Sequence, residues 1–199
     1  MSFLRPDLDA TPAYTRPEEP LGLVRLHMNE AASDWPPAAK EALLARLREL
    51  PFQQYPERQA ELTERLRLRL GAPEGGLLLG PSSGNLLDHV ALAGLRPGDA
   101  VAIPSPGFSL YPMLVRRHRG LVRPVEVGTG FPLASWFKAL DCRQLWITLP
   151  NNPTGAWLSP EELEPLLQSA AARPEPPLVV LDEAYAEFAP LTHRLAVDH

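Results

Sequence analysis

The sequence predicts an α/β fold built on a mainly parallel sheet, and three observations carry that prediction. Short apolar runs alternate with helical stretches from residue 77 to residue 182, as in a chain whose strands are joined by helices. The run 178–181 is continuously apolar, which is typical of a strand buried on both faces. It ends at Asp182, and open α/β sheets bind ligands at the carboxyl ends of their strands. We therefore expect a functional site at that edge.

The composition indicates a globular enzyme. The chain has 199 residues, of which 45% are hydrophobic, and a formal net charge of −5, which argues against an obligate nucleic-acid binder. No apolar run approaches a membrane span, and the charged N-terminus, interrupted by Pro6, does not have the pattern of a secretory signal. The single cysteine, Cys142, excludes an internal disulfide framework, and the scattered histidines predict no metal site. We expect a cytoplasmic location.

The first 50 residues are expected to form an arm. Prolines are frequent there, and 23–26 is a candidate extended piece. Leucines at helical spacing predict a helix at 37–50. A second helix is predicted at 57–70, where a glycine and a proline follow.

Strands and helices alternate along the rest of the chain. The predicted strands, each a short apolar run, are 77–79, 100–104, 121–127, 144–148 and 178–181. The predicted helices lie between them, at 86–92, from 106–111 up to the basic run 116–119, at 131–140 and after Ser159. The last helix has the clearest start, because Ser159 is followed by a proline and by a glutamate at the capping-box position.

A turn of small polar residues, 80–85, leads into the helix predicted at 86–92. Free backbone N–H groups and the positive end of the helix dipole make such a helix start a ready anion site. Ser83, Gly84 and Asn85 are the candidate anion-binding residues. On the residues alone, the alternative is that Ser83 or Asn85 only caps the helix.

Two further motifs, Asn152-Pro153-Thr154-Gly155 and Asp182-Glu183-Ala184-Tyr185, carry a family resemblance. They lie about thirty residues apart, which is typical of one crossover that contains a helix. Together they resemble the fold-type I aminotransferases that use pyridoxal 5'-phosphate, and especially the histidinol-phosphate aminotransferase branch. The resemblance implies a three-layer sandwich with a mainly parallel sheet. Residues 51–199 would be its cofactor-binding large domain, incomplete at the C-terminus, and 1–50 the arm and part of a small domain.

The resemblance also implies how the cofactor ring is held. Asp182 pairs with the pyridine nitrogen, Tyr185 and Asn152 hold the phenolic oxygen, and an aromatic residue, Phe108, stacks on the ring. Each residue has a structural alternative. Asp182 could be only a helix N-cap, and Tyr185 and Phe108 could be only core residues.

Four more residues are assigned to the cofactor phosphate by the same resemblance. Ser83, Gly84 and Asn85 bind it within the subunit. Tyr55, which precedes a proline, reaches the phosphate of the neighbouring subunit, so the resemblance implies a homodimer. A tyrosine before proline is also a common loop feature, because proline forces its predecessor into extended geometry.

The family reaction transfers an amino group between an amino acid, or an amino phosphate such as histidinol phosphate, and a 2-oxo acid. Its catalytic lysine forms a Schiff base with the cofactor, but the two lysines here, Lys40 and Lys138, fall upstream of the expected position. The catalytic residues are therefore unknown, and we expect an N-terminal part of a longer enzyme that is inactive by itself.

Asn29-Glu30-Ala31-Ala32 keeps only the first half of the family's Asn-Glu-Asn-Pro substrate motif. Two alternatives stay open: a lyase of the same fold, such as a threonine-phosphate decarboxylase, and a non-catalytic scaffold.

Overall fold

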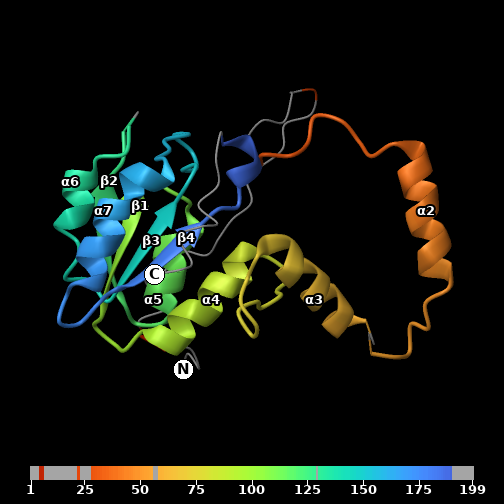
Figure 1. The fold of residues 1–199 in the computed structure, drawn as a ribbon, viewed down its shortest axis with the longest axis horizontal. Helices are drawn as coiled ribbons and strands as arrows, with labels where there is room; N and C mark the ends of the chain where they lie inside the picture. Colours follow the sequence, from red (N-terminus) through yellow and green to blue (C-terminus); the bar gives the residue numbers. More distant parts are fainter. Residues whose placement is uncertain (1–4, 7–21, 23–27, 56–57, 129, 190–199) are drawn as a thin grey trace.

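A four-stranded parallel sheet forms the centre of the molecule (Figure 1). The computed structural model describes residues 5–6, 22, 28–55, 58–128 and 130–189. The strands are β1 (Ala100–Ser105), β2 (Leu121–Glu126), β3 (Gln144–Thr148) and β4 (Leu178–Asp182). Their order across the sheet is β2-β1-β3-β4. Each strand is joined to the next in the chain by a connection that contains a helix, as parallel pairing requires.

Two helices cover each face of this sheet. One face carries α4 (Ser83–Gly94) and α5 (Leu110–Arg117), and the other carries α6 (Leu133–Phe137) and α7 (Pro160–Ala171). Side chains alternate between the faces along each strand. On β3, Trp146 packs with the α4 and α5 side, whereas Leu145 and Ile147 pack with the α6 and α7 side. The expected three-layer α/β sandwich is therefore confirmed.

The centre of the core is β3, whose five residues are all buried. Neighbouring strands flank it on both edges and helices cover both of its faces. Within this strand the indole N–H of Trp146 donates to Oε1 of Gln144 at 2.8 Å, whereas the buried Nε2 of Gln144 has no hydrogen-bond partner among the described residues. Burying a large apolar side chain such as Ile147 stabilises the fold by about 1.5–3 kcal/mol.

Three local predictions were wrong. The 178–181 strand, β4, is only half-buried because it is the last strand of the sheet order, and Leu178 is 49% exposed. The strand predicted at 77–79 does not form; no strand of the described sheet pairs with it, and Leu78 is exposed. The helix predicted at 131–140 is shortened to the five residues of α6.

The two N-terminal helices form close to where they were predicted. They are α2 (Pro37–Arg48) and α3 (Gln59–Leu70), and neither contains a buried residue. In Figure 1, α2 stands apart from the sheet, and its leucines Leu43, Leu44 and Leu47 are exposed. The candidate extended piece 23–26 lies outside the described residues. None of the helices in the described ranges has the length and apolarity needed to cross a membrane.

Candidate functional site

A cavity of about 70 Å³ lies at the carboxyl ends of β3 and β4. The residues that line it are Ser83, Phe108, Tyr111, Thr148, Asn152, Asp182, Ala184 and Tyr185. Five of these were singled out from the sequence, and they come from four separate segments of the chain. The parallel sheet brings them together because its strand ends meet at one edge.

Asp182 is held in this cavity by two donors. Its Oδ2 accepts a hydrogen bond from the Tyr111 hydroxyl at 2.7 Å, and its Oδ1 accepts one from the backbone N–H of Ala184 at 3.0 Å. A partly buried carboxylate needs such donors to offset the loss of water. Each oxygen retains another lone pair that can accept a further donor.

Tyr111 is a buried residue that was not predicted as part of the site. Its ring packs edge-on against Phe108, with centroids 5.7 Å apart, and against Trp146, with centroids 5.6 Å apart. Its hydroxyl lies 2.7 Å from Oγ1 of Thr148. Burial, followed by the nearby Asp182 carboxylate, raises the pKa of Tyr111 well above its ordinary value. The hydroxyl is therefore a permanent donor at neutral pH.

The start of α4 presents free amides beside the cavity. Ser82 is the N-cap, and its Oγ accepts the backbone N–H of Asn85 at 3.1 Å. The cap is therefore neither Ser83 nor Asn85. In the part of the chain that the structure describes, the backbone N–H groups of Ser83 and Gly84 have no partner. These two amides, at the positive end of a helix dipole, can bind an anion.

Phe108 is positioned by a tight turn between β1 and α5. A Cβ at Gly107 would lie 2.4 Å from the backbone oxygen of Pro104, so only glycine fits there without a backbone shift. The turn brings Phe108 to the wall of the cavity, where it packs on Tyr111. Phe108 thus belongs both to the cavity and to the margin of the core.

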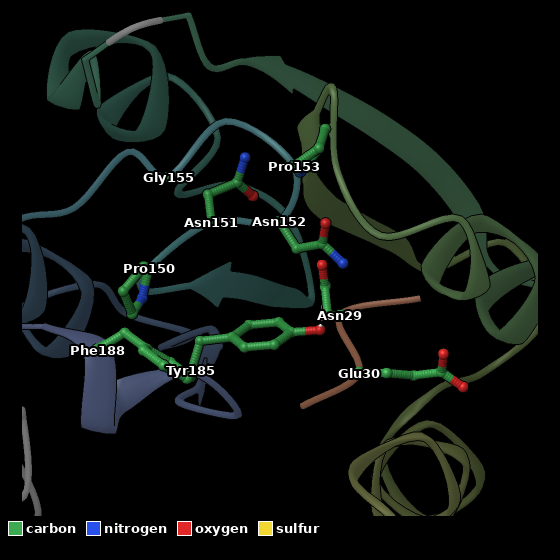
Figure 2. A pocket seen from close by; sticks show the side chains of 9 residues that line it. All are labelled: Asn29, Glu30, Pro150, Asn151, Asn152, Pro153, Gly155, Tyr185 and Phe188. Atoms are coloured by element: carbon green, nitrogen blue, oxygen red, sulfur yellow. Dashed lines mark hydrogen bonds between the residues drawn. The ribbon is translucent and has the colours of Figure 1, made fainter. Parts of the chain in front are cut away.

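A larger cavity, of about 390 Å³, adjoins the first and shares Asn152 and Tyr185 with it. In Figure 2 the side chains of Asn29, Asn152 and Tyr185 point toward one another, while Glu30 points away. Asn29 donates from Nδ2 to the Tyr185 hydroxyl at 2.8 Å. The retained half of the predicted substrate motif therefore lies at this cavity.

The loop that carries Asn152 is fixed by its neighbour. Asn151 is buried, and its Nδ2 donates to the backbone oxygen of Pro106 at 3.1 Å and to Oγ1 of Thr154 at 2.8 Å. Gly155 has a φ of +69°, a conformation that disfavours any other residue. These constraints leave the half-buried side chain of Asn152 between the two cavities.

Tyr55 and the lysines lie outside both cavities. The Tyr55 side chain is 96% exposed, so its role across a dimer stays a prediction. Lys40 pairs with Asp34 on the surface. Lys138 is exposed at the end of α6, which covers the sheet face opposite Tyr111. Within the described ranges no cluster of His, Cys, Asp and Glu could hold a metal ion.

Two residues of the cavity were not predicted from the sequence, although the sequence contains features that indicate them. Thr148 is the polar end of an apolar strand, as Asp182 is, so the strand-end argument applied to both. Tyr111 follows Phe108 by three residues, a spacing that places two side chains on one face of a helix start. Its bond to Asp182 spans 71 positions and could not be read from local pattern.

Solved structures share this architecture. Histidinol-phosphate aminotransferase from Sinorhizobium meliloti, determined in complex with pyridoxal 5'-phosphate, superposes with a TM-score of 0.68 over 78% of this chain and 42% of that one. At 24% identity this likeness shows the fold alone. A variant of Thermus thermophilus aspartate aminotransferase is 29% identical, with a TM-score of 0.65, over 92% of this chain and 51% of that one.

Curated relatives add the sequence relationship. Histidinol-phosphate aminotransferase 2 of Nitrosococcus oceani is 33% identical over 194 residues, which cover 94% of this chain and 52% of the relative. Histidinol-phosphate aminotransferase 2 of Pseudomonas aeruginosa is 35% identical over 175 residues, which cover 86% of this chain and 46% of the relative. The chain thus spans about half the length of these relatives. The family model for aminotransferase class I and II matches residues 22–198, and the chain belongs to that family.

Proposed function

We propose that this chain forms the pyridoxal 5'-phosphate-binding part of an aminotransferase. The whole enzyme would transfer an amino group from an amino acid, or from an amino phosphate such as histidinol phosphate, to a 2-oxo acid. The observation that carries the proposal is the oriented Asp182 carboxylate, which lies in one cavity with an aromatic ring and a helix start with free amides. The names of the Nitrosococcus oceani and Pseudomonas aeruginosa relatives support histidinol phosphate as the donor.

The residues around the cavity fit this cofactor chemically. A pyridine nitrogen that carries a proton needs an anionic acceptor, and Asp182 provides one. A phenolic oxygen needs hydrogen-bonding groups, and Tyr185 and Asn152 line the same cavity. A phosphate needs donors, and the amides of Ser83 and Gly84 have no other described partner.

When bound, the cofactor supplies an electron sink for the bonds at the substrate's α-carbon. The protein's part is binding and orientation. Asp182 keeps the proton on the ring nitrogen, because an adjacent anion favours the charged form. The Phe108 ring offers an aromatic face, and the start of α4 anchors the phosphate, which together would fix the ring's position.

The adjoining 390 Å³ cavity is our candidate for the amino substrate. It opens next to Asn152 and Tyr185, and Asn29 contributes a polar side chain hydrogen-bonded to Tyr185.

We also propose that residues 51–199 act as the large domain and that residues 1–50 act as an arm and part of a small domain. A homodimer in which Tyr55 completes the neighbour's phosphate site is part of the same proposal; the 96% exposure of Tyr55 supports it, because the side chain is available to a partner.

The test is an absorbance titration of the chain with pyridoxal 5'-phosphate and, separately, with pyridoxal, which has no phosphate. We expect the phosphorylated form to bind at least about tenfold more tightly, because charge-assisted hydrogen bonds contribute about 1.5–3 kcal/mol each. Inorganic phosphate should compete with it. Equal affinity for the two compounds would contradict the proposed phosphate site.

A further inference from the structure

We propose that Tyr111 and Thr148 form a relay of two hydroxyls that positions the Asp182 carboxylate for the cofactor nitrogen. The assignment rests on the proposed function, since it specifies how one residue of that site is oriented. Tyr111 and Thr148 act here as positioning residues, because they act on the cofactor only through Asp182.

The direction of the hydrogen bonds follows from counting protons. A carboxylate can only accept, so the Tyr111 hydroxyl donates its single proton to Oδ2 of Asp182. The oxygen of Tyr111 must then accept from Thr148, whose Oγ1 lies 2.7 Å away. The chain of donors therefore runs from Thr148 through Tyr111 to Asp182. Successive hydrogen bonds of this kind polarise one another in a buried setting.

The two ends of the relay are set by the sheet itself. Thr148 on β3 and Asp182 on β4 are direct partners in the strand register, so their side chains stand next to each other. Tyr111 comes from α5 and bridges them from above the sheet. Its ring has no exposed surface and is held by edge-on contacts with Phe108 and Trp146. The bridging hydroxyl consequently has little freedom to move.

Asp182 needs this support because β4 is the last strand of the described sheet and is only half-buried. The bond from the Ala184 N–H fixes one oxygen but leaves the carboxylate free to pivot about it. The second bond, from Tyr111, fixes the plane of the group. Since burial and the Asp182 charge raise the pKa of Tyr111, the donor stays protonated throughout the range in which the enzyme would work.

The test uses pyridoxal 5'-phosphate labelled with ¹⁵N in the ring, bound to chain 1–199, and reads the protonation of that nitrogen from its NMR chemical shift. In the unsubstituted chain the nitrogen should be protonated, and in Asp182→Asn it should be largely unprotonated. For Tyr111→Phe, which keeps the ring and removes the hydroxyl, we expect an intermediate shift and an affinity about three- to tenfold lower. Thr148→Val should move the shift in the same direction by a smaller amount.

The matched control is Thr63→Val. The Thr63 hydroxyl donates to the backbone oxygen of Gln59 on α3, outside both cavities, so its removal should leave the nitrogen signal unchanged. Thr148→Val decides the question if Tyr111→Phe does not fold. A wild-type nitrogen signal in both relay variants would overturn the assignment. No binding by the unsubstituted chain, or an unchanged signal in Asp182→Asn, would overturn the proposed function and the relay with it.

Discussion

Asp182 shows how much one residue depends on distant parts of the chain. The sequence places a carboxylate at a strand end, but its orientation comes from Tyr111 on α5 and from the backbone of Ala184. The first contact is long-range, so no local pattern could have revealed it. The strand-end position itself was predictable, because an apolar run followed by a carboxylate is a local signal.

Replacing Asp182 by asparagine keeps the shape of the side chain and removes its charge. We expect the affinity for pyridoxal 5'-phosphate to fall about 10- to 100-fold, because a charge-assisted hydrogen bond is lost. The same absorbance titration measures it. Asp141→Asn is the matched control, since that exposed carboxylate pairs with Arg123 away from the site. An affinity within twofold of the unsubstituted chain for Asp182→Asn would refute its role.

Tyr111 gives a prediction for alkaline pH. Its pKa is raised in the folded state, so above pH about 10 the unfolded chain loses this proton while the folded chain keeps it. The stability that the protonated Tyr111 hydroxyl contributes is fully present below that pH and is lost as the pH rises toward the pKa of Tyr111 in the folded state. Above that pH, the free energy of unfolding should decrease with pH in both proteins to different extents. The slope should be steeper in the unsubstituted chain than in Tyr111→Phe by about 1.4 kcal/mol per pH unit.

Urea denaturation between pH 8 and pH 11 measures this difference. The two proteins should show parallel stability curves below pH about 10 and diverging slopes above it. Identical slopes over the whole range would mean that the hydroxyl is not buried as described.

At the scale of elements, the sequence correctly predicted a feature that depends only on residues close together in the chain, the start of a helix. The helix α7 begins at the predicted residue because its start is determined by neighbours in sequence. Ser159 Oγ accepts the backbone N–H of Glu162 at 3.2 Å, and the Glu162 carboxylate accepts the backbone N–H of Ser159 at 2.8 Å. This reciprocal pair is the capping box that the sequence indicated.

Ser159→Ala should therefore destabilise the chain by about 1 kcal/mol, the usual cost of losing an N-cap side chain. Chemical denaturation with a constant m-value measures the change. The double variant with Glu162→Ala should lose less than the sum of the two single variants, because each residue caps through the other. Strict additivity would show that the two bonds are independent.

Two of the three wrong local predictions concerned strands, whose burial and pairing depend on neighbouring strands. An apolar run looks the same whether its strand lies in the middle of a sheet or at its edge. The run 178–181 was expected to be buried on both faces, yet β4 pairs only with β3 in the described sheet. The leucines at 77–79 have no strand to pair with in the described sheet, so this apolar segment does not form a strand.

At the scale of the whole molecule, the helices α2 and α3 contain no buried residue in the part of the chain that the structure describes. Both helices form close to where the sequence predicted them, but none of their side chains is buried. The chain also spans only about half of its relatives' length. Contacts with other parts of a longer enzyme or with a second subunit are outside what local spacing can predict, so the homodimer stays a prediction.

The positions of the lysines predict that chain 1–199 has no transaminase activity by itself. Lys40 lies on the exposed helix α2, and Lys138 lies on the sheet face opposite Tyr111. Neither should form a specific covalent bond with the cofactor. Borohydride reduction with pyridoxal 5'-phosphate, followed by peptide mass mapping, should find only sparse labelling. Stoichiometric labelling of one lysine together with turnover would show that the chain is active alone.

The most direct measurement is the ¹H–¹⁵N NMR spectrum of the chain during titration with pyridoxal 5'-phosphate. The backbone amides of Ser83 and Gly84 should shift most, together with Asp182 and its following turn, and inorganic phosphate should move the two helix-start amides alone. The amino ends of the strands provide the contrast, because a cavity of about 590 Å³ lies there beside Arg143 and Arg173. Shifts confined to that end of the sheet, with Ser83 and Gly84 unmoved, would contradict a cofactor site at the start of α4.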